Sequence, residues 1–83
     1  MKILYFAWLR SKIGTGEEEL TPPAQAVTVG QIMAWLTTLS PGHAEAFAKP
    51  VLIRAAVNQD FAGPDHPVGP DDELAFFPPV TGG

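Results

Sequence analysis

One segment of the chain repeats its apolar residues at helical spacing, and this segment constrains the fold more than any other. The repeat consists of four residues spaced 3, 4 and 3 apart: Val29, Ile32, Leu36 and Leu39. Such spacing places all four on one face of an α-helix, with Met33 and Trp35 flanking that face. The chain therefore has one main helix, which needs an apolar surface to pack against.

Both ends of this helix are marked by the local sequence. Thr28 and Gln31 have the spacing of a capping box, in which the hydroxyl and amide side chains satisfy backbone N–H groups left free at the helix start. The segment Ser40-Pro41-Gly42 follows the last apolar position, and we expect it to end the helix.

The residues before the helix predict two strands. Ile3 to Leu9 is apolar on both alternating faces, so we expect a central strand that is covered on both sides. Leu9 to Ile13 predicts a helical turn, and Gly14-Thr15-Gly16 then reverses the chain. Glu17 to Leu20 indicates a short, charged edge strand that pairs with the first as a hairpin.

The residues after the helix predict shorter elements. His43 to Lys49 indicates a short helix resting on Phe47. Val51 to Asn58 predicts the third strand, and a brief strand is expected around Phe61. Glu73 to Phe77 predicts the last strand.

This order of elements, β-β-α-β-β, is typical of an α+β protein. Apolar first and last strands suit the centre of a sheet, where the two would lie side by side in parallel. We therefore expect a β-grasp, ubiquitin-like fold, with a mixed sheet of about four to five strands packed against one main helix. The domain would span residues 1–77, and residues 78–83 would form a projecting C-terminal tail.

Composition limits the kinds of function. The 83 residues suffice for one domain, and with 46% hydrophobic and 17% charged residues the chain should fold by itself. The net charge is −4 and the basic residues are scattered, so no basic stripe for nucleic acid is present. Cysteine is absent, which excludes disulfides, a thiolate zinc site and a cysteine nucleophile.

A metal site and a membrane segment are not expected either. His43 and His66 have no potential ligands at metal-binding spacing. The apolar run from Ile3 to Leu9 is too short to span a membrane and lacks a small-residue cleavage site. We assign no targeting segment and expect a cytoplasmic protein.

The C-terminal end has an unusual composition. Pro78 and Pro79 supply no backbone N–H and hold φ near about −65°, so the sheet must stop before them. Gly82 and Gly83 lack side chains, so the tip of this arm fits a channel too narrow for a Cβ atom. The alternative is a frayed terminus, the fate of most chain ends. Such ends are seldom preceded by a Phe-Phe-Pro-Pro segment.

Several segments together resemble the small subunit of molybdopterin synthase. They are Phe6-Ala7 with Arg10 and Gly14, Ala55-Ala56-Val57-Asn58-Gln59, Asp65-His66-Pro67 and, above all, Ala75-Phe76-Phe77-Pro78-Pro79-Val80-Thr81-Gly82-Gly83. The resemblance spans nearly the whole chain. Its long ending is highly specific, whereas the Gly-Gly pair alone fits any ubiquitin-like carrier. Asp71-Asp72 departs from the family's Asp-Gly-Asp turn, which puts that turn in question but not the tail.

The resemblance implies that the C-terminal carboxylate of Gly83 is the working group. An ATP-dependent activating adenylyltransferase would convert it to an acyl-adenylate, and sulfur from a persulfide donor enzyme would displace AMP and leave a thiocarboxylate. The large subunit of the synthase would receive the tail, made of Pro78, Pro79, Val80, Thr81, Gly82 and Gly83. There the sulfur would pass to a cyclic pyranopterin monophosphate, building the dithiolene that binds molybdenum.

The resemblance also implies a heterotetramer of two small and two large subunits, with no permanently bound cofactor in the small one. The residues of this chain supply no general acid, base or oxyanion hole. We therefore expect a sulfur-donating subunit that is not catalytic alone and that binds neither nucleic acid nor membrane.

Three residues are expected to contact the partner. Successive strand residues point to opposite faces, so Phe76 and Phe77 cannot both enter one core. Aided by the resemblance, we assign Phe77 and Phe61 to an exposed binding patch; packing under a loop is the alternative. Arg10 would add a rim contact to an acidic partner, or is simply solvated.

Two other functions stay open. One is a sulfur carrier for thiamin synthesis or tRNA thiolation, which the ending from Phe76 to Thr81 disfavours. The other is a ubiquitin-like modifier or plain interaction module, in which Gly83 forms an isopeptide bond or none.

Overall fold

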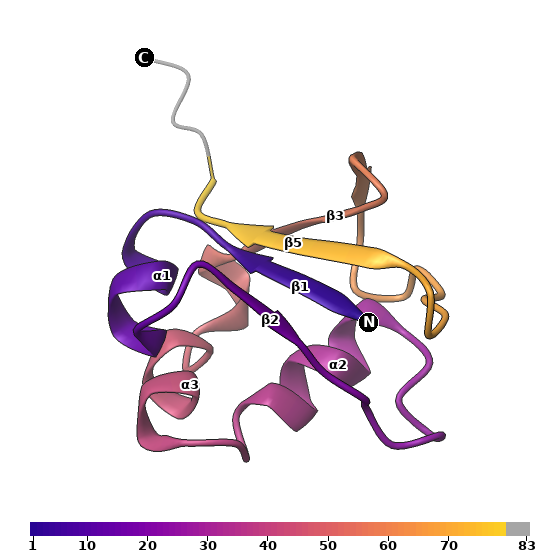
Figure 1. Ribbon diagram of the computed structural model, residues 1–83. Coiled ribbons are helices and arrows are strands. Elements are labelled where there is room, and N and C mark those ends of the chain that lie inside the picture. The colour runs from indigo at the N-terminus through magenta and orange to yellow at the C-terminus, as the bar shows by residue number, and fades with distance from the viewer. Residues whose placement is uncertain (80–83) are drawn as a thin grey trace.

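A mixed five-stranded sheet forms one layer of the molecule and the helices form the other (Figure 1). The computed structural model describes residues 1–79. The elements in chain order are β1 (Lys2–Tyr5), α1 (Trp8–Ile13), β2 (Glu17–Glu19), α2 (Val29–Leu36), α3 (Pro41–Ala46), the 3₁₀ helix η1 (Pro50–Leu52), β3 (Arg54–Val57), β4 (Asp60–Ala62) and β5 (Glu73–Phe77). The strands lie in the order β2-β1-β5-β3-β4.

The first and last strands lie side by side inside the sheet. β1 and β5 are parallel, with Ile3 opposite Leu74 and Tyr5 opposite Phe76. β2 pairs antiparallel with β1, while β3 pairs antiparallel with both β5 and β4. This topology confirms the predicted mixed sheet, the opening hairpin and the parallel terminal strands, and it is the β-grasp arrangement. The brief strand around Phe61 and the last strand are also confirmed.

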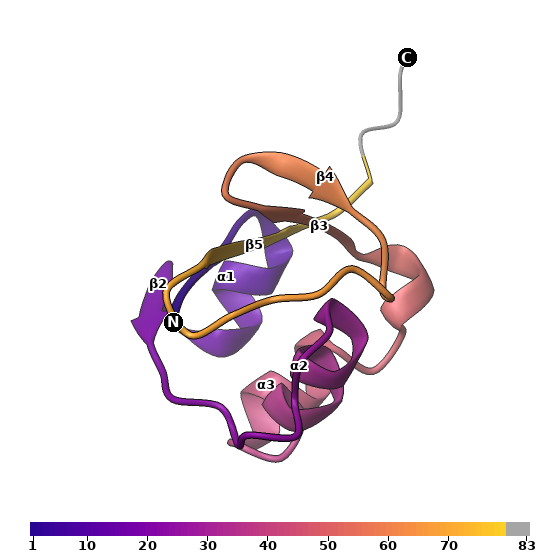
Figure 2. The ribbon, with the colours of Figure 1, turned by 90° about the vertical axis from the view of Figure 1, so that its right-hand side faces the viewer.

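The core lies between one face of the sheet and the helices beneath it (Figure 2). Its largest fully buried side chains come from both layers: Tyr5, Phe47, Phe76, Ile3, Leu9, Ile32, Leu36, Leu74 and Val29. The ring of Phe47, directly after α3, packs edge-on against Tyr5 and Phe76, with centroids 6.3 and 5.0 Å away. Such edge-to-face contacts stabilise an aromatic core beyond the burial of their area. The short helix predicted to rest on Phe47 is therefore present as α3.

A partly buried polar cluster connects the edge strand β2 to α3. One oxygen of Glu18, Oε2, accepts from the Tyr5 hydroxyl at 2.7 Å and lies 2.8 Å from His43 Nε2, while Ser40 Oγ lies 2.7 Å from His43 Nδ1. Burial opposes ionisation of Glu18, but the hydrogen bonds from His43 and Tyr5 outweigh it and lower the pKa of this carboxyl. Burial and the bond to Glu18 raise the pKa of Tyr5, which stays a donor. His43 thus has a structural role in the fold.

The start of the main helix is confirmed in detail. Gln31 N–H donates to Thr28 Oγ1 at 3.2 Å, and Thr28 N–H donates back to Gln31 Oε1 at 3.1 Å. These are the two reciprocal bonds of a capping box. Local side-chain chemistry therefore fixes where α2 begins.

The predicted end of the same helix is wrong. α2 ends at Leu36, because the N–H groups of Thr38 and Leu39 bond to carbonyls three residues back, which tightens the chain out of α-helical geometry. Ser40 does not terminate α2; its Oγ caps the first turn of α3. Leu39 consequently lies outside the helix and is 38% exposed.

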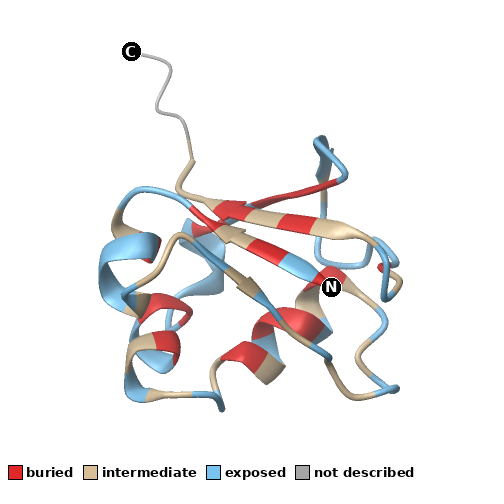
Figure 3. Cartoon of the chain, in the orientation of Figure 1, coloured by how far each residue is buried: buried red, intermediate tan, exposed pale blue. Residues whose placement is uncertain are grey.

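The first strand is covered on one face only, which corrects the expectation of a strand buried on both sides. Ile3 and Tyr5 are buried, whereas Leu4 is half-buried and Phe6, just past the strand, is 48% exposed. The reason is that the helices all pack on one side of the sheet, so buried residues alternate with accessible ones along β1 and β5 (Figure 3). The apolar outer face of β1 is left for solvent or a partner.

The third strand begins later than predicted. Val51 and Leu52 belong to η1, in which the N–H groups of Leu52 and Ile53 bond to the carbonyls of Lys49 and Pro50. The fixed φ of Pro50 favours this tight turn at its first position. Strand β3 starts only at Arg54, and the apolar side chains of η1 do not enter the core.

Candidate functional site

The base of the C-terminal tail is held on two sides by the sheet. Phe76 is fully buried, and its carbonyl accepts from the Phe6 N–H at 3.1 Å, which extends the link between β5 and β1 past the end of β1. On the other side Phe77 lies opposite Arg54 of β3. Pro78 and Pro79 follow and lead the chain away from the sheet (Figure 1). The expected site residues Val80, Thr81, Gly82 and Gly83 lie outside the described residues.

Two of the expected contact residues lie together on the outer face of the sheet. Phe61 is 85% exposed and Phe77 is half-buried, and their ring centroids are 5.9 Å apart. The strand register explains this closeness, because Phe61 is opposite Ala56 on β3 and Phe77 is opposite Arg54, two residues along the same strand. The two rings border a shallow hollow of about 390 Å³. An exposed aromatic pair therefore stands directly beside the tail.

The third expected contact residue is separate from this pair. Arg10 lies on α1, and its guanidinium packs over Gly16, where an added Cβ would be 3.3 Å from Arg10 Cζ. Gly16 accepts from the Tyr5 N–H, so this position borders β1 and the start of β2. Arg10 thus lies beyond β1, whereas Phe61 lies on β4 at the opposite edge of the sheet.

Two accessible residues near the tail were not identified as site residues from the sequence. Phe6 is 48% exposed and Arg54 is exposed, and each is linked to β5 next to the tail. For Phe6 the signal was present, because it alternates with the buried Ile3 and Tyr5. For Arg54 the sequence contains no such signal, because its position opposite Phe77 follows from strand pairing.

The turn before β5 is well formed despite its unusual Asp71-Asp72 sequence. Asp72 accepts from the Gly69 N–H at 2.7 Å and from Asn58 Nδ2 at 2.9 Å. These bonds, the backbone one above all, hold the pKa of Asp72 below its ordinary value. Asn58 also accepts from the Glu73 N–H at 3.0 Å. The side chain of Asn58 therefore connects the β3–β4 hairpin to the start of β5.

His66 is part of loop structure. Its Nδ1 lies 2.8 Å from the Pro67 carbonyl, and its own carbonyl accepts from the N–H of Val29 at the start of α2. Within residues 1–79 no three His, Cys, Asp or Glu side chains gather as metal ligands. No helix in that part of the chain is long and apolar enough to cross a membrane.

Comparison with known proteins identifies the family. The ThiS family matches residues 3–83 of the chain. The chain belongs to the ThiS family. The match runs through the final Gly82-Gly83 pair, so it includes the ending that follows the described residues.

Individual relatives of this ThiS family chain cover its full length. It is 41% identical over 83 residues to the molybdopterin synthase sulfur carrier subunit of Escherichia coli strain K12, covering 100% of this chain and 99% of the relative. It is similar in structure to SAMP1 from Haloferax volcanii, with 27% identity, a TM-score of 0.74 and coverage of 100% and 98%. A Pyrococcus furiosus candidate molybdopterin converting factor subunit 1 is 25% identical, with a TM-score of 0.76 and 95% of each chain covered.

Proposed function

We propose that this chain carries sulfur as a thiocarboxylate on Gly83 and is the small subunit of a molybdopterin synthase. The observation that carries the proposal is the full-length, 41% identical relative that bears this function, combined with a ThiS family match that extends through the terminal Gly82-Gly83 pair. The base of the tail supports it, because Phe76 anchors the strand in the core and, after Phe77, two prolines follow that cannot continue the sheet.

The chemistry takes place at the chain terminus and needs no side chain of this protein. Adenylation of the Gly83 carboxylate by ATP releases pyrophosphate and turns a poor electrophile into a good one. A persulfide sulfur then attacks the acyl carbon and displaces AMP, and cleavage of its S–S bond by a thiol leaves the thiocarboxylate. The chain has no cysteine, so both sulfur donor and thiol belong to partner enzymes. In the second stage the thiocarboxylate sulfur attacks a carbon of the pyranopterin precursor, and water then hydrolyses the resulting thioester, which leaves the sulfur on the pterin and restores the Gly83 carboxylate.

The architecture divides these tasks between a domain and an arm. Residues 1–77 form the domain, and residues 78–83 form the tail that enters the active sites of its partners. Those partners are an activating adenylyltransferase, a sulfur donor enzyme and the large synthase subunit, which joins two copies of this chain in a heterotetramer in the cytoplasm. The small subunit binds no permanent cofactor.

The surface beside the tail suits a partner contact. Phe61 exposes an aromatic ring to solvent, and Phe77 lies next to it at the last position before the tail. Exposed aromatic residues that cluster are enriched at protein interfaces. We assign Phe61 and Phe77 to the central contact and Arg10, beyond β1, to its rim.

The terminal carboxylate is tested by changing chain length alone. Deleting Gly83, or adding one residue after it, should abolish sulfur transfer and leave the midpoint of thermal unfolding nearly unchanged, because the core ends at Phe76. Mass spectrometry of the wild-type chain after incubation with its activating system should show a gain of about 16 Da, the exchange of oxygen for sulfur. Molybdopterin formation is then assayed with the large subunit and the pyranopterin precursor.

The outcomes separate the competing functions. Full activity of either length variant would contradict the proposal. A thiocarboxylate that forms but yields no molybdopterin would favour a carrier for thiamin or tRNA thiolation. A persistent conjugate to lysine would favour a protein modifier.

A further inference from the structure

The 3₁₀ helix η1 is apolar yet wholly outside the core. None of its three residues is buried; Val51 is 78% exposed and Leu52 is 46% exposed. Single exposed apolar residues are common on protein surfaces. Here they are consecutive and end one residue before β3, the strand that pairs with the base of the tail. Such a cluster needs a physical explanation.

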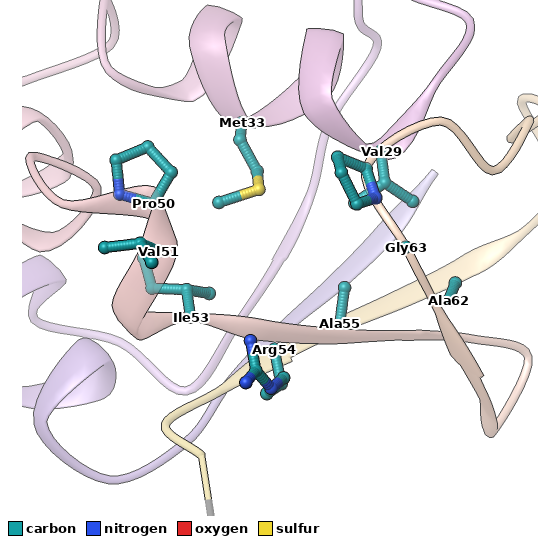
Figure 4. A pocket seen from close by; sticks show the side chains of 10 residues that line it. Val29, Met33, Pro50, Val51, Ile53, Arg54, Ala55, Ala62 and Gly63 are labelled. Carbon is teal, nitrogen blue, oxygen red and sulfur yellow. The ribbon is translucent and has the colours of Figure 1, made fainter.

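Beside η1 the surface is hollowed to about 300 Å³ (Figure 4). Val29 and Met33 point into the hollow from α2, and Pro50 and Val51 border it from η1. Every lining side chain except that of Arg54 is apolar or absent, and a Cβ atom added at Gly63 would meet no atom within 4 Å. A preformed apolar hollow of this kind suits the anchor residue of a partner protein, the type of contact that contributes most to binding.

Arg54 connects this hollow to the site at the tail. It lines both this hollow and the one bordered by Phe61 and Phe77, and it lies opposite Phe77 in the sheet. The two hollows also share Ala55, Ala62 and Gly63. A protein that receives the tail and covers the aromatic pair therefore reaches the second hollow without a break in the contact surface.

The charge around the hollow indicates what such a partner carries. The chain as a whole has a net charge of −4, but Lys49 and Arg54 flank η1 on either side in the sequence. Arginine pairs with carboxylates through a planar set of donors. The surface therefore suits an apolar side chain next to an acidic one.

We propose that the hollow between α2, η1 and β3 is a second docking site for the large synthase subunit, which inserts an apolar side chain there and sets a carboxylate against Arg54. The inference rests on the proposed function. The large subunit is the expected partner, because an apolar contact continuous with the tail is typical of permanent subunit interfaces.

The test is the affinity of the full chain for the large subunit of the same organism, measured by isothermal titration calorimetry. Val51→Asp should raise Kd at least about ten-fold, equivalent to about 1.4 kcal/mol. Gly63→Leu should also raise Kd, because it adds a bulky side chain at a position that lines both hollows and removes no contact. Both positions are open to solvent, so neither change should lower the unfolding midpoint.

Val27→Asp is the matched control. Val27 is 49% exposed, but it lines a different hollow, beside Met1 and Val68. Its replacement should change Kd by less than about two-fold.

Three results would overturn the inference in distinguishable ways. If Val51→Asp and Gly63→Leu bind like the wild type, the hollow is not a docking site, while the proposed function stands. If the wild type self-associates in sedimentation and Val51→Asp does not, the hollow belongs to a second copy of this chain. If the wild type forms no complex with the large subunit, the proposed function fails and this inference fails with it.

Discussion

The two ends of the sheet are built in opposite ways. At the end where the tail leaves, Phe6 and Val51 expose large apolar side chains, and the exposed ring of Phe61 reaches Phe77 there from β4. At the opposite end, the β3–β4 hairpin and the turn before β5 are joined by the hydrogen bonds of Asn58 with Asp72 and Glu73. One end leaves apolar surface uncovered, whereas the other satisfies its polar groups internally.

The charges follow the same division. Five acidic residues lie at or next to the strand ends opposite the tail, where they outnumber Lys2 and the N-terminal ammonium: Glu19, Asp60, Asp71, Asp72 and Glu73. Near the tail, Arg54 lies opposite Phe77, and Arg10 packs beside the end of β1. Stability and partner binding therefore depend on different ends of the sheet. Substitutions opposite the tail should change the free energy of unfolding, whereas substitutions at the tail end should change the affinity for the partner.

The largest effect on stability is expected at the end opposite the tail. Asn58→Ala removes two hydrogen bonds and places alanine at φ 50°, a left-handed conformation that asparagine tolerates better. The free energy of unfolding, measured with urea, should fall by about 2 to 3 kcal/mol. Affinity for the large subunit should not change. Asn58→Gly removes the same two hydrogen bonds but adopts a positive φ freely, so its free energy of unfolding should fall less. The difference between the two variants then measures the cost of the alanine conformation.

The same variant makes a prediction about pH. Asp72 has a lowered pKa, so its contribution to stability is present above the ordinary carboxyl pKa and disappears as the pH falls through its folded-state pKa. Asn58→Ala removes one of its donors and should move the pKa of Asp72 upward, as followed by NMR titration. An unmoved pKa together with unchanged stability would remove the distinction between the two ends.

The next largest effect is expected at the tail end, and on binding. Phe61→Ala should raise Kd for the large subunit about ten-fold, which corresponds to about 1.4 kcal/mol, while stability changes by less than about 0.5 kcal/mol because the ring is exposed. Phe77→Ala is the comparison, since this half-buried ring should affect both quantities. A Phe61 variant with normal affinity and a lower unfolding midpoint would assign that ring to folding.

Sequence reasoning succeeded where a few neighbouring residues decide the structure. The capping box of Thr28 and Gln31 predicts the helix start because both bonds form within one turn. Apolar runs at both termini predict strands at the centre of the sheet, and the order β2-β1-β5-β3-β4 confirms this, although β1 is covered on one face only. The end of the last strand at Phe77 is confirmed for the same reason, since Pro78 has no N–H to continue the pairing; the tail beyond it stays a prediction.

Sequence reasoning failed where distant residues or competing local hydrogen bonds determine the structure. Ser40 suits the end of one helix or the cap of the next, and the sequence does not rank the two. Val51 and Leu52 favour a strand by type, but Pro50 directs them into η1, and their exposure depends on how α2 packs. The closeness of Phe61 and Phe77 follows from strand register across β3, which the sequence alone does not provide.

The smallest effect concerns strain near the tail. Ala7 joins β1 to α1 with φ 56° and ψ −133°, a region that side chains disfavour and glycine enters freely. Ala7→Gly relieves this strain but also raises the conformational entropy of the unfolded chain. The net gain in the free energy of unfolding should therefore be about 0.5 to 1 kcal/mol. Gly14→Ala is the mirror test, because Gly14 has φ 96° and its Cβ would meet no atom within 4 Å, so any loss of stability comes from the backbone. If Ala7→Gly lowers stability while Gly14→Ala also lowers it, the Ala7 conformation is not strained, and the tail end differs from the opposite end in its exposed surface alone.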